Sequence, residues 1–207
     1  IEGLERLADE LGPDQAAMMH MALLTSGRWA ECAGLQVGGA DPLAGKLTIA
    51  FQLDRRRQLV DPKSEAGRRT MSVPAWFLED LAGVLARREL TAADADELVF
   101  VNSLGRPWSY SPWRRSVWLP ATERAGLAGV GFHDLRRKNA STMIANKVDI
   151  KTAQTRFGHA TPGLMIRLYA AAEPAADFEA SEKIGDVFRP RDERGMKVRP
   201  RVRHRGR

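Results

Sequence analysis

The chain has 207 residues, of which 43% are hydrophobic and 28% are charged, and its formal net charge is +6 at pH 7. This composition is typical of a globular protein with one good-sized domain or two small ones. The single cysteine, Cys32, excludes an internal disulfide framework and a Cys-x-x-Cys zinc site, and the longest nearly apolar stretch, residues 16–24, is too short to span a bilayer.

Three helices are predicted at the start of the chain, because apolar residues recur there at helical spacing. The first helix ends at Gly12-Pro13, and Asp14 is a suitable N-cap for the second. A Ser-Gly break separates the second helix from the third. The expected ranges are residues 2–11, 14–26 and 28–35.

Strand signals follow in the next part of the chain, where β-branched and other apolar residues form short runs bounded by turn residues. The expected strands are residues 46–53, 57–61 and 68–73. The last two flank a segment rich in turn formers, residues 62–67, which predicts a hairpin with Lys63 at its tip.

The second half of the chain is predicted to be helical. Pro74 begins a helix, residues 102–111 form a turn-rich connection, and Pro120 bends the helix that follows it. The further expected helices are residues 112–125, 133–146, 149–157, 161–169 and 175–188. The sequence therefore predicts a mainly α domain with a small antiparallel β-sheet, in the α+β class.

The positive charge is concentrated at the end of the chain. Residues 189–207 hold nine basic and two acidic residues, whereas residues 1–188 have a net charge of −1. The isoelectric point near 9.9 therefore reflects the tail. The tail has few apolar residues to bury, so we expect it to be disordered. Such a tail either contacts nucleic acid or another anionic surface, or is a solvated end.

Six polar residues stand out by their positions near the ends of predicted elements. Each of them has an ordinary structural interpretation by itself, such as a solvated surface charge, a polar turn or a core tyrosine with its hydroxyl at the surface. Two of them, three residues apart at the start of a helix, lie on one helix face. The six residues are Arg28, Lys63, His133, Arg136, His159 and Tyr169.

Taken together and in this order, these residues resemble the catalytic signature of the tyrosine recombinase family, of the phage integrase type. The similarity extends to their surroundings and covers roughly residues 4–188, the catalytic domain of that family. The matching segments are residues 25–35 (TSGRWAECAGL) for the first arginine box, residues 62–74 for the lysine hairpin, residues 132–137 (FHDLRR) for the second box, and residues 155–161 (TRFGHAT) with 167–169 (RLY) for the box that leads to the nucleophile.

The resemblance implies the fold of DNA breaking-rejoining enzymes and the activity of a site-specific DNA recombinase or integrase. Such an enzyme serves the integration or excision of mobile genetic elements. Tyr169 would attack DNA and form a 3′-phosphotyrosyl ester. The guanidinium groups of Arg28 and Arg136 suit the non-bridging phosphate oxygens, because each donates paired hydrogen bonds and keeps its charge.

The roles of three further residues are also implied by the resemblance. Lys63 would protonate the departing 5′-oxygen. His133 would assist proton transfer at the tyrosine hydroxyl, and His159 would donate a hydrogen bond to a non-bridging phosphate oxygen. Tyrosine needs such help near neutral pH, because its ordinary pKa is about 10.

No metal or cofactor is expected, because no two histidines are close in the sequence and no His, Asp or Glu cluster has ligand spacing. The implied partners are double-stranded DNA, a homo-tetramer on synapsed DNA and an accessory DNA-bending protein, and no membrane. We expect a bacterial or phage-encoded protein of the cytoplasm. Basic pairs and triplets of the body, one of them Arg68-Arg69, are candidates for phosphate contact. The DNA-binding candidates are Arg55, Arg56, Arg68, Arg137 and Lys138.

Some positions depart from the commonest pattern of the family. Arg137 stands where a histidine is more usual, and Phe157 where leucine is common. These departures leave open a catalytically decayed, DNA-binding copy of the fold. A DNA relaxase of the type IB topoisomerase kind, which shares this chemistry, is a second alternative. The usual N-terminal core-binding domain does not fit before Leu4, so we expect a catalytic fragment or truncated copy. Its domain would be residues 1–188, followed by the tail, residues 189–207.

Overall fold

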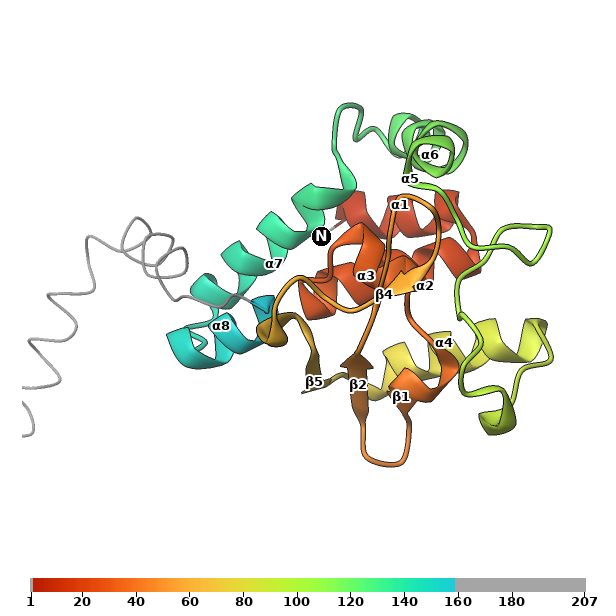
Figure 1. Cartoon of the computed structure of the whole chain (residues 1–207). Coiled ribbons are helices and arrows are strands. Elements are labelled where there is room, and N and C mark those ends of the chain that lie inside the picture. Colours follow the sequence, from red (N-terminus) through yellow and green to blue (C-terminus); the bar gives the residue numbers. More distant parts are fainter. Residues whose placement is uncertain (1, 159–207) are drawn as a thin grey trace, which may run out of the picture. The chain divides into compact units, whose positions relative to one another are not determined.

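The structure, a computed structural model, describes residues 2–158, and the elements within that range are shown in Figure 1. The helices are α1 (Glu2–Leu11), α2 (Pro13–Thr25), α3 (Trp29–Ala33), α4 (Ala75–Arg87), α5 (Tyr110–Trp113), α6 (Leu119–Arg124), α7 (Phe132–Ala145) and α8 (Ile150–Phe157). The strands are β1 (Ala40–Asp41), β2 (Lys46–Ile49), β3 (Gln52–Leu53), β4 (Leu59–Val60) and β5 (Arg69–Ser72). Short 3-10 helices η1 (Val37–Gly39), η2 (Glu65–Gly67) and η3 (Ala92–Asp94) and a π-helical turn, η4 (Arg114–Trp118), complete the set.

The first three predicted helices are confirmed, with one correction at the start of α2. Gly12, at φ 74°, is the N-cap of α2, and Pro13 occupies its first turn. Proline fits that position because its φ is already helical and its missing N–H would have no partner there. Asp14 is therefore not the N-cap as predicted. Its carboxylate instead accepts hydrogen bonds of 2.9 and 2.6 Å from Arg87 of α4.

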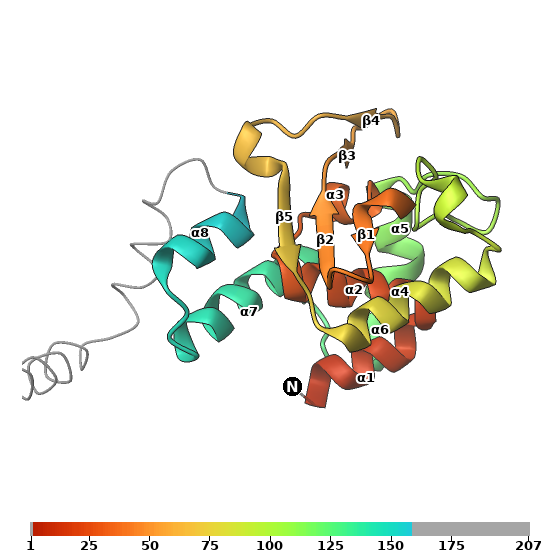
Figure 2. The ribbon, with the colours of Figure 1, turned by 90° about the horizontal axis from the view of Figure 1, so that it is seen from below.

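The strands form two small antiparallel sheets. β2 lies between β1 and β5, with Lys46 opposite Ser72 and Ile49 opposite Arg69. β3 and β4 pair with each other. The single strand expected over residues 46–53 is therefore two strands, β2 and β3. Figure 2 shows β1, β2 and β5 side by side, with β3 and β4 at one end of them.

The predicted hairpin around Lys63 is wrong, because β4 and β5 belong to different sheets. Residues 62–67 instead form a link between the sheets, which contains η2. The hairpin in this region is β3–β4. Its turn is closed by the Asp54 carboxylate, which accepts hydrogen bonds from the backbone N–H groups of Arg56 and Gln58 at 2.8 and 2.9 Å, a local pairing that is typical of aspartate in turns.

The helices predicted between residues 74 and 157 are confirmed in position. The expected helix over residues 112–125 consists of α5, η4 and α6. Pro120, which has no N–H to donate, lies in the first turn of α6, two residues after the end of the π-helical turn, and accounts for the break in the regular pattern. Asp149 caps α8 by accepting the backbone N–H of Thr152 at 2.8 Å, and Gly158, at φ 60°, ends that helix.

The core surrounds α2, which contacts α1, α4 and α7 and whose Met18 and Met21 are fully buried. A second part of the core is aromatic. Trp113, Trp118 and Phe132 lie with ring centroids 5.2–5.6 Å apart and join α5 and η4 to the start of α7. This cluster holds in place the first turn of α7, which carries His133.

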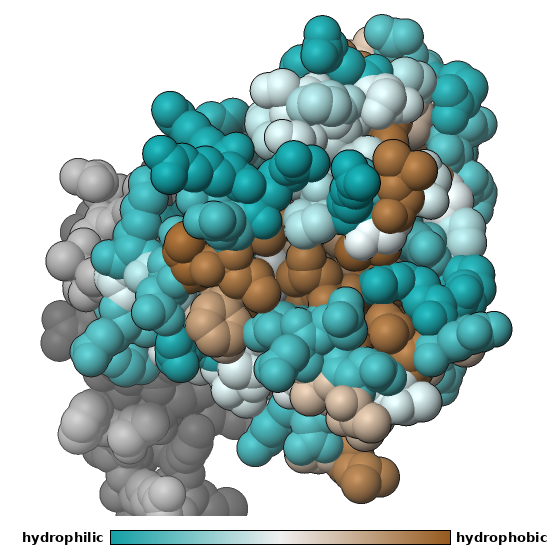
Figure 3. Space-filling view, turned by 45° about the vertical axis from the view of Figure 1, so that its right-hand side comes forward, coloured by the Kyte–Doolittle hydropathy of each residue, from teal (hydrophilic) through white to brown (hydrophobic). Residues whose placement is uncertain are grey.

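One face of the molecule is shown in Figure 3, where hydrophilic residues surround a band of apolar residues. Within residues 2–158, the large apolar side chains that are exposed come from well-separated parts of the chain: Leu43, Trp76, Leu104, Tyr110 and Ile150. No helix in this range is both long and apolar enough to cross a membrane.

Candidate active site

Arg28 is placed by a tight turn between α2 and α3. Ser26 adopts a left-handed conformation at φ 55°, and Gly27 packs on Cys32, whose Sγ would lie 2.6 Å from a Cβ added at Gly27. Arg28 is the N-cap of α3, and its backbone N–H donates to Glu31 Oε2 at 3.0 Å. The turn therefore directs the Arg28 side chain away from the core, where it is 45% exposed.

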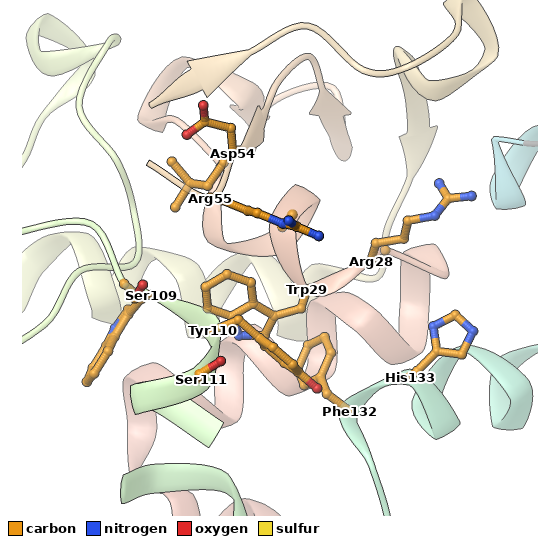
Figure 4. Close-up of a pocket in the computed structure, with 13 residues that line it drawn as sticks. Arg28, Trp29, Asp54, Arg55, Ser109, Tyr110, Ser111, Phe132 and His133 are labelled. Atoms are coloured by element: carbon orange, nitrogen blue, oxygen red, sulfur yellow. The ribbon is translucent and has the colours of Figure 1, made fainter. Parts of the chain in front are cut away.

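Arg28 and His133 line the same pocket, which has a volume of about 550 Å³. Figure 4 shows the two side chains next to each other at one side of the pocket. Aromatic rings form much of its wall, and the β3–β4 hairpin contributes Asp54 and Arg55. The aromatic residues are Trp29, Trp108, Tyr110 and Phe132. The structure thus brings together two predicted site residues that are far apart in the chain.

Glu31 is a buried carboxylate that lies between two arginines. Its Oε1 accepts a 2.8 Å hydrogen bond from Arg28 Nη1, and its Oε2 accepts a 2.9 Å bond from Nη2 of the buried Arg69. Burial by itself would raise the pKa of the Glu31 carboxyl. The charge of Arg69 and the hydrogen bonds from Arg69 and Arg28 outweigh that effect, so the pKa is lowered and the group stays ionised.

Arg136 is buried and binds backbone carbonyl groups. It donates to the carbonyl oxygen of Ser26 and, at 2.7 Å, to that of Phe157, and its guanidinium lies 4.5 Å from the centroid of the Phe157 ring. Burial and the nearby charge of Arg28 lower the pKa of Arg136 to about 10, which leaves it cationic at neutral pH. Arg136 thus joins the ends of α2 and α8.

His133 lies in the first turn of α7, and its side chain is exposed. Partial desolvation and the positive charges of Arg136, Arg137 and Arg28 lower the pKa of its imidazole below the ordinary value of 6.5. The ring is therefore neutral at neutral pH, the state in which one nitrogen accepts a proton.

Lys63 is exposed in the link, two residues before η2. The end of that link packs against α8, because a Cβ at Gly158 would lie 2.8 Å from the carbonyl oxygen of Ala66. His159 and Tyr169 lie outside the described residues, as do the helices predicted at residues 161–169 and 175–188 and the tail.

The DNA-binding candidates are all at the surface. Arg55 and Arg56 are exposed on the β3–β4 hairpin. Arg68 pairs with Asp61 at 2.6 Å and is 56% exposed. Arg137 and Lys138 are exposed on α7.

Sequence reasoning missed the buried Arg69 and the half-buried Arg156. Arg69 belongs to a basic pair considered for phosphate contact, but its side chain is 3% exposed. The alternation of β5 could have located it, because Arg69 shares the inward face with Met71. Arg156 donates to the carbonyl oxygens of Leu24 at 2.7 Å and Ser72 at 3.2 Å. Partial burial lowers the pKa of its guanidinium group. No sequence pattern marks this residue.

In the part of the chain that the structure describes, no group of three or more His, Cys, Asp or Glu side chains is placed to hold a metal ion. The charged side chains that line the pocket are Arg28, Arg55 and Asp54, and the neutral imidazole of His133 lies beside them. The two arginines are suited to an anionic ligand, since guanidinium groups bind phosphate oxygens through charge-assisted hydrogen bonds.

Known proteins share both sequence and fold with this chain. Residues 3–175 match the Phage integrase family. Tyrosine recombinase XerC of Lactobacillus leichmannii is 38% identical over 85 residues, which are 40% of this chain and 28% of XerC. The Tn1549 transposon integrase in complex with a circular intermediate DNA superposes with a TM-score of 0.72 and 16% identity, over 87% of this chain and 63% of that one. The catalytic domain of bacteriophage HP1 integrase superposes with a TM-score of 0.59 and 20% identity, over 92% of this chain and 95% of that one.

The chain thus corresponds to 28% of the length of XerC and to less than two thirds of the Tn1549 integrase. The structural likenesses confirm the predicted fold class, mainly α with a small antiparallel sheet, as that of an integrase catalytic domain. The family match covers most of the sequence. The chain therefore belongs to the phage integrase family.

Proposed function

We propose that this chain is the catalytic part of a site-specific tyrosine recombinase, which cleaves and rejoins DNA through a phosphotyrosyl ester at Tyr169. The observation that carries the proposal is the pocket at which Arg28 and His133 meet from separate boxes. Membership of the phage integrase family supports the same activity, as does the likeness of the fold to an integrase bound to DNA.

Arg28 is suited to bind the phosphate that is cleaved. Its Nη1 is engaged by Glu31, whereas Nε and Nη2 have no hydrogen-bond acceptor within residues 2–158. A half-exposed guanidinium with free donors can bind non-bridging phosphate oxygens and stabilise the charge that develops on them. Removal of one such donor costs about 3–4 kcal/mol of transition-state stabilisation in comparable sites.

The remaining roles follow from the chemistry of each side chain. As the Tyr169 oxygen attacks the phosphorus, its proton passes to the neutral imidazole of His133. The bond from phosphorus to the 5′-oxygen breaks, and Lys63 supplies the proton that this oxygen takes up. His159 donates a hydrogen bond to a non-bridging oxygen. Arg136 supplies positive charge beside the phosphate, while its Nη1 and Nη2 donate to the carbonyl oxygens of Ser26 and Phe157. Attack by a 5′-hydroxyl on the ester reverses each transfer, so the bond energy is conserved.

The wider DNA contact belongs to the same proposal. The β3–β4 hairpin places Arg55 at the pocket, and the other exposed cations, Arg56, Arg68, Arg137 and Lys138, are candidates for contacts with flanking phosphates. We also assign residues 1–188 to the catalytic domain and residues 189–207 to a basic tail. Two synapsed DNA sites with four copies of the protein, and an accessory DNA-bending protein, complete the proposed assembly.

The test is covalent capture of DNA by the full chain. The substrate is a pool of duplexes with a randomised core and a nick near it, so that cleavage releases a short fragment and traps the ester. Wild-type protein is expected to retain DNA after denaturation, and sequencing the retained DNA identifies the site. Peptide mapping by mass spectrometry should then locate the adduct at Tyr169 and not at Tyr110.

The same experiment separates the alternatives. The variant Tyr169→Phe should retain no DNA, and retention by that variant would contradict the proposed nucleophile. If wild-type protein retains none across the pool, the chain is a decayed copy and the proposal is wrong. Relaxation of a supercoiled plasmid that lacks the captured site would instead indicate a type IB topoisomerase-like enzyme.

A further inference from the structure

Arg69 is a buried arginine with three different hydrogen-bond acceptors. From β5, its Nη2 donates to Glu31 Oε2 at 2.9 Å, its Nη1 to the carbonyl oxygen of Gly67 at 2.9 Å, and its Nε to the carbonyl oxygen of Arg156 at 3.0 Å. Its side chain is 3% exposed. One guanidinium therefore binds α3, the link that carries Lys63, and the end of α8.

These three segments are the ones that carry the proposed catalytic groups. Gly67 is four residues after Lys63, and Arg156 is three residues before His159. The fit is close, because a Cβ at Gly158 would lie 2.8 Å from Arg69 Nη1. Displacement of Arg69 would therefore loosen the link and the α8 terminus together.

The charge of Arg69 matters as much as its hydrogen bonds. Glu31 is 1% exposed, and a buried carboxylate is costly unless cations and donors surround it. Because Arg69 binds Oε2, Arg28 needs to give Glu31 only its Nη1 and its backbone N–H. Without Arg69, Glu31 would draw in both terminal nitrogens of Arg28, since a bidentate pair is the strongest replacement that Arg28 can supply.

We infer that Arg69 is a positioning residue of the proposed strand-cleavage site: it neutralises Glu31 and thereby leaves the donors of Arg28 free for phosphate. The inference rests on the proposed function in taking phosphate as the ligand of Arg28. The arrangement of Arg69, Glu31 and Arg28 does not depend on that function. The Arg69 side chain is enclosed, so the proposed contact with phosphate is assigned to Arg28 and not to Arg69.

The first experiment measures covalent adduct formation in a single turnover at saturating DNA, with the captured site as substrate. Arg69→Met is expected to slow this step by about 10²-fold, the usual effect of small misplacements at a catalytic centre, with little change in the DNA dissociation constant. Arg69→Lys keeps the charge but cannot reach three acceptors, so its rate of adduct formation should lie between those of wild type and Arg69→Met. Arg87→Met is the matched control, because it removes an arginine paired with a carboxylate, Asp14, outside the site.

Charge rescue separates positioning from a purely structural role. In the double variant Arg69→Met/Glu31→Gln the buried negative charge is gone, so Arg28 is released again. We expect the double variant to form adduct about tenfold faster than Arg69→Met, equivalent to recovery of one charged hydrogen bond. If both form adduct equally slowly, Arg69 acts only through packing and the inference is wrong.

A second experiment needs no DNA. Proton exchange with water is measured by NMR at the arginine Nη–H groups, with Arg28→Lys used to assign the Arg28 signals. Exchange at Arg28 should slow by about tenfold in Arg69→Met, as the bidentate pair forms, and return in the double variant. Equal exchange in wild type and Arg69→Met would overturn the inference. Absence of adduct in wild type would instead contradict the proposed function alone.

Discussion

Gly158 and Ala66 approach each other so closely that no side chain fits at residue 158. A Cβ there would lie 2.8 Å from the carbonyl oxygen of Ala66, and the backbone of Gly158 has a φ of 60°, which favours glycine. The contact joins the glycine before His159 to the link that carries Lys63. Two boxes of the family signature are therefore in direct van der Waals contact.

Substitution of Gly158 should test this contact. Gly158→Ala is expected to cost about 1 kcal/mol for the left-handed backbone and about 1–3 kcal/mol more for the collision. Gly126→Ala is the matched control, because Gly126 has a φ of 73° with nothing within 4 Å of an added Cβ, so only the first cost applies. Urea unfolding of the full chain measures both, and equal losses would show that the Ala66 contact is unimportant.

Gly27 and Cys32 form a second such pair. Gly27→Ala would place its Cβ 2.6 Å from Cys32 Sγ, and we expect it to lower the free energy of unfolding by about 1–3 kcal/mol. In a Cys32→Ala background the sulfur is absent, so the same substitution should cost less than half as much. The comparison is a double-mutant cycle measured by urea unfolding. Additive costs would contradict the proposed collision.

Glu31 should make stability depend on pH in the acid range. Its folded-state pKa lies below the ordinary value of 4.5, so the unfolded chain binds more protons between those two values and stability rises with pH there. The contribution of Glu31 is therefore complete above pH 4.5 and is lost as pH falls through the folded-state pKa. Glu31→Gln should flatten this part of a plot of unfolding free energy against pH. An unchanged slope would show that Glu31 is not the titrating group.

Lys63 can be tested as the proposed general acid. Lys63→Ala should slow adduct formation on ordinary DNA, because the 5′-oxygen leaves poorly without a proton. A substrate with sulfur in place of that bridging oxygen needs no acid, and it should restore the rate of the variant towards wild type. Adduct formation is measured in a single turnover with both substrates. Equal impairment on both would remove Lys63 from this role.

Local sequence signals predicted most helices well, because the residues that begin or end a helix lie next to it in the sequence. Gly12-Pro13 separates α1 from α2, and Asp149 caps α8 with its side chain. Strand pairing was harder. The turn formers around Lys63 suggested a hairpin, but pairing depends on partners far along the chain, and β5 joins β2. A short strand has no local signal that specifies its neighbour.

The predicted site shows the same division. Arg28 and His133 meet at one pocket, as the family resemblance implies. The burial of Arg69 was missed because arginine is normally exposed unless it is paired, and its partner Glu31 is 38 residues away. The contacts of Arg136 with the carbonyl groups of Ser26 and Phe157 have no sequence signal at all, since every residue has a carbonyl oxygen.

The arginine-to-carbonyl contacts also have a consequence for how the chain folds. They join residues 110 apart for Arg136 and Ser26, 132 apart for Arg156 and Leu24, and 87 apart for Arg69 and Arg156. Closing such long loops costs chain entropy before any contact forms, and contacts of this range slow folding. These contacts are therefore expected to form late in folding, and a partly synthesised chain that ends before α8 lacks the two that involve Arg156.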